Sequence, residues 1–403
     1  MFVAGNGNGR VEVFKLNDDG TLAQPTATYI LGKPSEYARR SHAGAWSESQ
    51  TEFPGTLAID HTNQRLFLVD NATGQSLPGF GSQIMVFDIH PDRIETGEKV
   101  LAVLGQPHAD SKTIGLAANH VGRRLGLAVD EANQRLFASD GSNNRVLIFD
   151  ISPNNFKTGM DASVVLGQEN FTSREPGLNA YRLSRPGALA YDPTNQRLFV
   201  SDNGNRRVMI FDVAPDRLQT FAAATDVMGQ PDFDTSEPRT NLTGFATGGL
   251  AYDDRTARLF IAEQVSRIEH MRISVYEVEL GTSLRAAVPM AILGKPGFDA
   301  YDPIVSREQS VWPRLGSASI DSERQLLVAT EGYPGGNRAI IWDISPERLR
   351  TGMPAVEVVG HLDDEGHTDF ERRAANDRVT PRNIYPRDVV LDPIDHRLFA
   401  IDQ

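Results

Sequence analysis

Short apolar runs alternate with polar turns along the whole chain, and the runs recur in a fixed order of four. The clearest copy reads Leu125–Asp130, Arg135–Asp140, Arg145–Asp150 and Ser163–Gln168. Each run is rich in Val, Ile, Leu and Phe and is bounded by Asp, Asn, Gly or Pro, which indicates β-strands and not helices. The pattern therefore predicts four short strands in each repeat.

The four-run order occurs six times. The Asp that closes the first run recurs at intervals of 61 to 71 residues, at Asp60, Asp130, Asp192, Asp253, Asp321 and Asp392. A second run beginning Arg-Leu-Phe follows in every copy but one, where Gln325-Leu-Leu takes its place. A repeat of this length built only from strands predicts an all-β fold, a six-bladed β-propeller with four antiparallel strands in each blade.

The two ends of the chain are expected to complete one blade together. The C-terminus supplies the first and second runs of that blade, and the N-terminus supplies the third and fourth, which leaves no open sheet edge. We expect one domain, 1–403, with blades at approximately 387–403 plus 1–32, 55–106, 124–168, 186–230, 247–295 and 315–361.

Two hairpin sequences resemble NHL repeats: Asp140-Gly-Ser-Asn-Asn-Arg-Val-Leu-Ile-Phe149 and Asp202-Asn-Gly-Asn-Arg-Arg-Val-Met-Ile-Phe211. The fourth-run endings Val-Leu-Gly-Gln168 and Val-Met-Gly-Gln230 resemble them too. The likeness covers nearly the whole chain and implies a propeller. NHL-type propellers include protein-binding and RNA-binding modules, and relatives of similar shape include lyases and lactonases, so the resemblance alone does not choose a function.

Composition narrows the range of partners. The chain has 53 Asp and Glu against 40 Lys and Arg, a formal charge of −13. Nonspecific nucleic-acid binding depends on Lys and Arg, so a nucleic-acid partner is not favoured. The lack of cysteine excludes disulfides and thiolate metal sites, and it favours an extracytoplasmic location. The first residues have neither a basic segment nor an apolar segment of the kind found in signal peptides, so none is expected in this sequence, and no apolar stretch is long enough for membrane insertion.

Acidic residues recur at the end of the second run and arginines at the start of the third. The acids are Asp70, Asp140, Asp202, Glu263, Glu331 and Asp402. The arginines are Arg10, Arg145, Arg207, Arg272 and Arg338. Because the pairing repeats from blade to blade, we interpret it as structural and not as a binding site.

The first runs line the central channel of a propeller, and here they offer small and apolar side chains. A metal-dependent hydrolase or lyase would need several ligands converging there, so the sequence leans against an enzyme and predicts no catalytic residue. The alternative is a metal held by loops at the channel mouth. Weak candidates for a calcium or zinc site are His361, Asp363, Asp364 and His367; no other cofactor is expected.

Long connections of roughly 25–30 residues join each fourth run to the next first run, and all of them emerge on one face of a propeller. They carry the candidate ligand-binding residues Arg39, Arg40, His42, His120, Arg124, Arg182, Arg185, Arg314 and Arg387. Guanidinium groups suit an anionic or carboxylate ligand. The alternative is that these arginines cap loop carbonyls and pair with nearby acids.

The sequence therefore favours a non-enzymatic binding or scaffolding module that uses this face. The expected partner is a protein or an extracytoplasmic polymer such as a polysaccharide. A metal-dependent hydrolase or lyase is the first alternative, and an RNA-binding module is a weaker one. The oligomeric state is not predicted.

Overall fold

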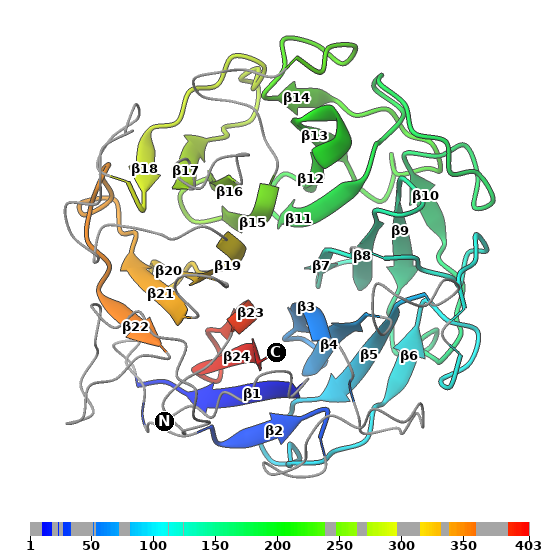
Figure 1. The fold of residues 1–403 in the computed structure, drawn as a ribbon, viewed down its shortest axis with the longest axis vertical. Coiled ribbons are helices and arrows are strands. Elements are labelled where there is room, and N and C mark those ends of the chain that lie inside the picture. The colour runs from blue at the N-terminus through cyan, green and yellow to red at the C-terminus, as the bar shows by residue number, and fades with distance from the viewer. Residues whose placement is uncertain are drawn as a thin grey trace, which may run out of the picture.

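Six sheets of four antiparallel strands surround a central channel in the computed structural model (Figure 1). The structure describes residues 10–17, 23, 27–33, 51, 54–71, 81–111, 113–123, 125–237, 247–263, 272–295, 315–331, 338–359 and 386–402. This arrangement confirms the predicted six-bladed propeller. In the described residues, helical structure is confined to the short 3-10 helix η1 (Asn203–Asn205). No helix there has the length and hydrophobicity needed to cross a bilayer.

Each blade runs from an inner first strand to an outer fourth strand. Blade 1 contains β3 (Pro54–Asp60), β4 (Arg65–Asp70), β5 (Gln83–Asp88) and β6 (Ala102–Leu104). Blade 2 contains β7 (Leu127–Asp130), β8 (Arg135–Asp140), β9 (Arg145–Asp150) and β10 (Val164–Leu166). Blade 3 contains β11 (Pro186–Asp192), β12 (Arg197–Asp202), β13 (Arg207–Asp212) and β14 (Asp226–Met228).

The other three blades follow the same order. Blade 4 contains β15 (Thr247–Asp253), β16 (Arg258–Glu263), β17 (Arg272–Glu277) and β18 (Ala291–Leu293). Blade 5 contains β19 (Leu315–Asp321), β20 (Leu326–Glu331), β21 (Arg338–Asp343) and β22 (Glu357–Val359). The closing blade contains β23 (Pro386–Asp392), β24 (Arg397–Asp402), β1 (Arg10–Lys15) and β2 (Tyr29–Leu31).

The closing blade joins the two ends of the chain as predicted. Its strand order is β2-β1-β24-β23, and the β1–β24 ladder extends from the pair Arg10 and Asp402 to the pair Lys15 and Arg397. In Figure 1 this blade lies at the bottom, where the blue and red ends of the colour range meet. The ladder pairs both strands along their whole length, so neither is an exposed edge.

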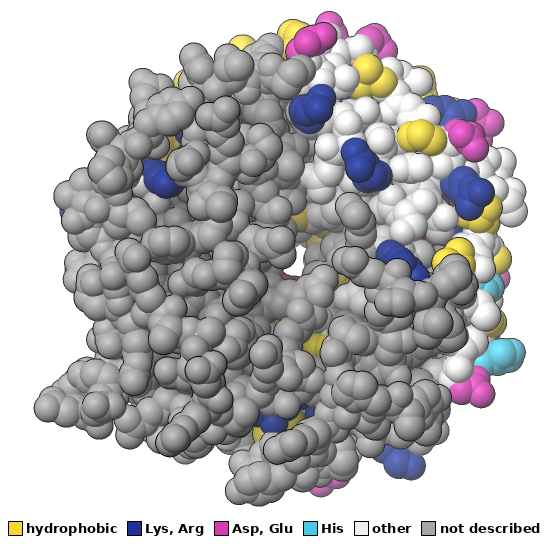
Figure 2. All heavy atoms as spheres, viewed as in Figure 1, with side chains coloured by type: hydrophobic (Ala, Val, Ile, Leu, Met, Phe, Trp, Pro, Cys, Tyr) yellow, Lys and Arg dark blue, Asp and Glu magenta, His cyan; other side chains and the backbone are white. Residues whose placement is uncertain are grey.

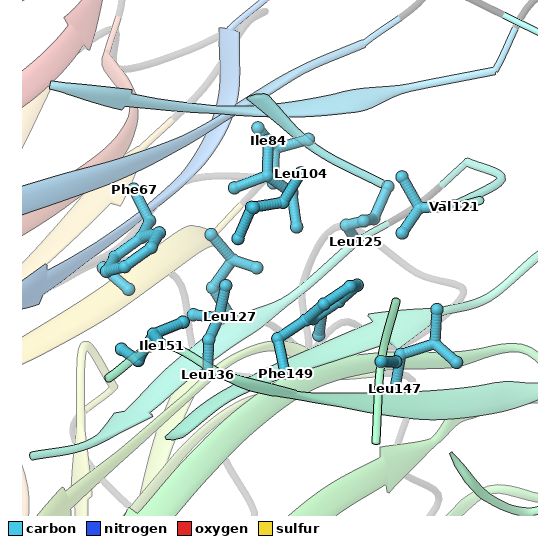
Figure 3. Packing of buried hydrophobic residues seen from close by; sticks show 14 of the residues in the cluster. Phe67, Ile84, Leu104, Val121, Leu125, Leu127, Leu136, Leu147, Phe149 and Ile151 are labelled. Atoms are coloured by element: carbon cyan, nitrogen blue, oxygen red, sulfur yellow. The ribbon is translucent and has the colours of Figure 1, made fainter. Parts of the chain in front are cut away.

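The hydrophobic core lies between the blades. Between blades 1 and 2, Phe67 and Ile84 pack against Leu136 and Phe149, and all four side chains are fully buried (Figure 3). Because both faces of a blade are covered by its neighbours, the strands are continuously apolar instead of alternating. This burial explains the uninterrupted Val, Ile, Leu and Phe runs in the sequence.

The inner strands approach one another closely. A Cβ atom added to Gly126 would lie 2.3 Å from the carbonyl oxygen of Gly187 in the next blade. Five of the inner strands also show a shift of register near their first residues, which is typical of a β-bulge: β3, β11, β15, β19 and β23. Small residues are therefore required where the first strands converge.

The recurring Arg-Leu-Phe has a structural cause that the sequence pattern did not reveal. In blades 1, 3 and closing, its Arg binds the Asp five residues earlier and donates to a backbone carbonyl of the next blade. The three carbonyl contacts are Arg65 to Ile151 (2.8 Å), Arg197 to Val278 (2.7 Å) and Arg397 to Ile89 (2.6 Å). Each Arg thus fastens its blade to the following one.

Candidate functional site

Two faces of the ring differ in their connections. The long-loop face carries the hairpins between second and third strands and the long connections from each fourth strand to the next first strand, such as 141–144 and 167–185. The turn face carries the turns between first and second strands and the connections between third and fourth strands, such as 131–134 and 151–163.

The acid–arginine pairs on the long-loop face are structural, as predicted. Arg145 Nε donates to Asp140 Oδ2 at 3.0 Å, and neither side chain is accessible to solvent. Arg145 also donates to the carbonyls of Leu116 (2.9 Å), His120 (2.8 Å) and Phe171 (2.6 Å). One guanidinium group therefore holds the long connections on both sides of blade 2. Burial raises the pKa of Asp140, and Arg145 opposes that shift.

Arg207 does the same for blade 3. Its Nε donates to Asp202 Oδ2 at 2.7 Å, and its other nitrogens bind the carbonyls of Phe233, Asn179 (3.0 Å) and Arg182 (3.1 Å). Burial likewise raises the pKa of Asp202 against the effect of Arg207. Blade 4 repeats the pair with Arg272 Nε and Glu263 Oε2 at 2.8 Å. The long connections on both sides of blade 3 are thus bound by a buried guanidinium group.

The central channel forms a cavity of about 580 Å³ lined by the six inner strands. The prediction of a small and apolar wall is incomplete, because Asp388, His61 and Glu131 also line it. Asp388 lies on β23, directly before the apolar part of that strand. Its Oδ2 accepts a hydrogen bond from Leu57 N at 2.6 Å, across the seam between the closing blade and blade 1.

His61 and Glu131 stand where the channel opens on the turn face. His61 Nδ1 lies 2.6 Å from Glu131 Oε1, and His61 Nε2 lies 3.7 Å from Asp392 Oδ1. Burial by itself would lower the pKa of His61, but the carboxylates of Glu131, Asp392 and Asp60 raise it above its usual value. This histidine therefore connects blade 1 with blade 2 and with the closing blade.

Three of the predicted ligand-binding residues have described side chains: His120, Arg182 and Arg185. Outside the described residues lie Arg39, Arg40, His42, Arg124 and Arg314, and the metal candidates His361, Asp363, Asp364 and His367. Arg387 lies on β23, where only its backbone is described. Among the described residues, no three His, Asp or Glu side chains gather as a metal ion requires.

His120 is held within its own connection. Its Nδ1 lies 2.9 Å from Asn119 Oδ1, and its Nε2 lies 3.3 Å from Thr113 Oγ1. Burial and the neighbouring positive charge of Arg145 lower its pKa. Both shifts favour the neutral ring, and both of its nitrogens contact neighbouring residues.

Arg182 and Arg185 differ although they lie three residues apart. Arg182 forms an ion pair with Glu169, and its guanidinium carbon stands 5.6 Å from the ring centre of Phe221. Arg185 is exposed, and its side chain makes no hydrogen bond or ion pair in the part of the chain that the structure describes. Of the two interpretations given for these arginines, Arg182 fits the paired one and Arg185 fits the anion-binding one.

Two further exposed arginines on this face, Arg174 and Arg206, escaped the sequence analysis. Most of the predicted arginines lie near the start of a first strand, whereas Arg174 lies midway along a connection and Arg206 in a hairpin. Arg206 Nη1 donates to the carbonyl of Ser236 at 3.1 Å. Figure 2 shows the face that bears η1; in its coloured part, several Lys and Arg side chains lie between the channel and the rim, and most Asp and Glu side chains lie near the rim.

Comparison with known proteins gives no family assignment. Neither a protein-family model nor a curated protein sequence matches the chain. Among solved structures, similarity is found to a protein from Lactobacillus plantarum (16% identity, TM-score 0.48) and to a candidate 6-phosphogluconolactonase from Bacteroides uniformis (12% identity, TM-score 0.49), each covering 98% of this chain and 89% of the other. A nidogen–laminin complex is also similar (12% identity, TM-score 0.42, covering 87% of this chain and 93% of the other).

Proposed function

We propose that this protein is a binding or scaffolding module of NHL type that holds its partner on the long-loop face. One observation carries the proposal: the buried pairs of Arg145 and Arg207 fix the long connections of successive blades, while Arg174 and Arg185 remain exposed and unpaired among the described residues of the same face. A surface that is already ordered loses little conformational entropy when a ligand binds.

The nature of the partner follows from charge and composition. A protein or an extracytoplasmic polymer is favoured over nucleic acid, because the chain carries a formal charge of −13. The lack of cysteine supports a location outside the cytoplasm. The hairpins 140–149 and 202–211, which resemble NHL repeats, support the NHL type.

The test uses the absence of cysteine, which allows each face to be attached to a support through one introduced thiol. Lys157→Cys lies on the turn face and Asp234→Cys on the long-loop face, and both positions are exposed. Each protein is coupled to beads and incubated with an extract of the organism that encodes the chain. We expect partners to be retained by the Lys157→Cys beads, whose long-loop face is free, and lost from the Asp234→Cys beads.

The control is the same pair of proteins immobilised through a flexible terminal tag, where both should retain the partner equally. Retention that does not depend on the attached face, or that is lost only when the turn face is attached, would contradict the proposal.

A further inference from the structure

A single amide side chain holds two unpaired arginines together on the long-loop face. Asn144, in the hairpin of blade 2, donates from Nδ2 to the carbonyl of Arg174 at 2.8 Å. Its Oδ1 accepts a hydrogen bond from the backbone N of Arg185 at 2.7 Å. Because both bonds come from one side chain, the backbones of Arg174 and Arg185 are fixed next to each other over the seam between blades 2 and 3.

The backbone at Asn144 is itself held by a buried side chain. The buried side chain of Gln168 donates from Nε2 to the carbonyls of Asn144 and Glu175, each at 2.9 Å. The carbonyl of Glu175 follows directly after Arg174, so this connection is fastened at two successive residues. The two arginines therefore project from a framework that is ordered before any ligand arrives.

The positive charges on this framework have no counterion within the described part of the chain. Arg174 and Arg185 are both exposed, and neither guanidinium group takes part in a hydrogen bond or ion pair there. The neighbouring acid Glu169 is already bound to Arg182. Because Asn144 holds the backbones of both residues, one anionic ligand can reach two positive charges that have no counterion there.

An exposed aromatic ring stands beside the arginines in sequence. Tyr181 is 45% exposed, and its ring centre lies 5.1 Å from that of Phe221. Arg182 covers the same Phe221 ring. Tyr181 belongs to the same connection, 167–185, as both arginines, so an apolar side chain of a peptide can pack on its ring while the peptide's carboxylates bind guanidinium groups.

We propose that Arg174 and Arg185, positioned by Asn144, bind an acidic peptide segment of a partner protein through its Asp and Glu carboxylates. The inference rests on the proposed function, since it names the ligand class for the long-loop face. Guanidinium groups bind carboxylates through paired, charge-assisted hydrogen bonds.

A long polyanion fits this site less well than a short acidic segment. The exposed acids Glu169 and Glu175 flank the arginines, and the whole chain carries a formal charge of −13. Both would repel the extended phosphate backbone of RNA more strongly than a short segment that carries only two or three carboxylates.

The experiment measures fluorescence anisotropy with the full chain and two labelled synthetic peptides. One is a short peptide rich in Asp and Glu that also contains a Leu; the other carries Asn and Gln at the acidic positions. We expect the acidic peptide to bind in low salt, to weaken as salt is added, and to bind at least about tenfold more tightly than its amide counterpart.

Variants locate the binding site. Arg174→Glu and Arg185→Glu should each weaken binding of the acidic peptide about tenfold or more. Lys157→Glu makes the same change in charge on the turn face and should have little effect. Asn144→Gly keeps both arginines and suits the positive φ of 56° at this position. It removes only the positioning amide, and should weaken binding without abolishing it.

Several outcomes would overturn the inference. Equal binding of the two peptides would show that the ligand is not recognised by its acidic side chains. Unchanged affinity in both arginine variants would show that the peptide does not bind at Arg174 and Arg185. Tighter binding of a labelled oligouridine, lost in the same variants, would make the ligand a nucleic acid instead. If the bead experiment still depends on the attached face while these variants have no effect, the proposed function stands and only this assignment fails.

Discussion

Glu12 places a carboxyl group at a core position where four other blades place an apolar side chain and blade 4 places Ser274. Its counterparts on the third strand are Leu147 in blade 2 and Met209 in blade 3, both fully buried. Arg10 donates to Glu12 Oε1 from Nε at 2.9 Å and from Nη2 at 2.6 Å. Glu12 Oε2 has no hydrogen-bond partner among the described residues. Burial raises the pKa of Glu12 to about 7, although Arg10 opposes the shift.

The raised pKa predicts a defined dependence of stability on pH. A carboxyl group whose pKa is higher in the folded state than in the unfolded chain does not lower the free energy of unfolding at a pH where both states are protonated. As the pH rises from the pKa in the unfolded chain toward about 7, the group lowers the free energy of unfolding progressively. Above that pH the reduction is constant. We therefore expect the Glu12→Gln variant, which cannot ionise, to match the wild-type protein near pH 4.5 and to exceed it by on the order of 2–3 kcal/mol at pH 8.

The measurement is a series of urea unfolding titrations of both proteins between these pH values. Taking the difference between the two proteins cancels the titration of other groups, including His61. A difference that stays constant with pH would show that the Glu12 carboxyl group is not shifted.

At the scale of the element, the order of runs was enough to predict which segments are strands. The hydrophobic period and the bounding turn residues act locally, so the sequence pattern contains them. The start of β7 shows the limit of that information. The apolar run begins at Leu125, but the strand begins at Leu127, because Gly126 is bound to Ser139 through both its N (2.6 Å) and its carbonyl (2.9 Å).

The candidate site was only partly predictable for a similar reason. That an acid and an arginine pair across the hairpins of blades 2, 3 and 4 follows from their short spacing in the sequence. Which loop carbonyls Arg207 binds does not, since they belong to residues 25 to 28 positions away. Likewise the sequence cannot show that Asn144 aligns Arg174 and Arg185, because these contacts join a hairpin to residues 30 and 41 positions later in the chain.

The buried hairpin pair should matter far more than an exposed pair of the same spacing. Arg207→Met leaves Asp202 buried without its partner and removes three bonds to loop carbonyls, so we expect a loss of about 3–5 kcal/mol in the free energy of unfolding. The matched control is Arg217→Met, which breaks the exposed pair with Asp212 and should cost less than about 1 kcal/mol.

Urea titration gives both values. Hydrogen exchange gives an independent readout, because in Arg207→Met the connections 177–185 and 229–236 should lose protection while the strands of blade 5 keep theirs. Similar losses of stability in the two variants would contradict the structural role of the buried pair.

For the whole molecule, rigidity comes from contacts between blades as well as within them. His61 connects blade 1 with blade 2 and the closing blade, and the Arg of Arg-Leu-Phe fastens successive blades on the turn face. On the long-loop face, Arg145 and Arg207 donate hydrogen bonds to carbonyls of the long connections. Both faces of the ring are thus held independently of the hydrophobic core, which suits a module that presents a fixed surface.

The seam between the closing blade and blade 1 has its own contact, which predicts how ring closure contributes to stability. The first strands turn their free edges toward the channel, so a backbone N there needs an acceptor. Asp388 supplies one for Leu57 N at 2.6 Å, as Ser317 does for Val389 N at 3.1 Å one blade earlier. Asp388→Ala should lower the free energy of unfolding by about 1–3 kcal/mol, because Leu57 N is left buried without that acceptor. Asp388→Asn keeps an acceptor and should lose less than half as much in the same urea titration. Equal losses would mean that the charge of Asp388, and not its hydrogen bond across the seam, stabilises the closed ring.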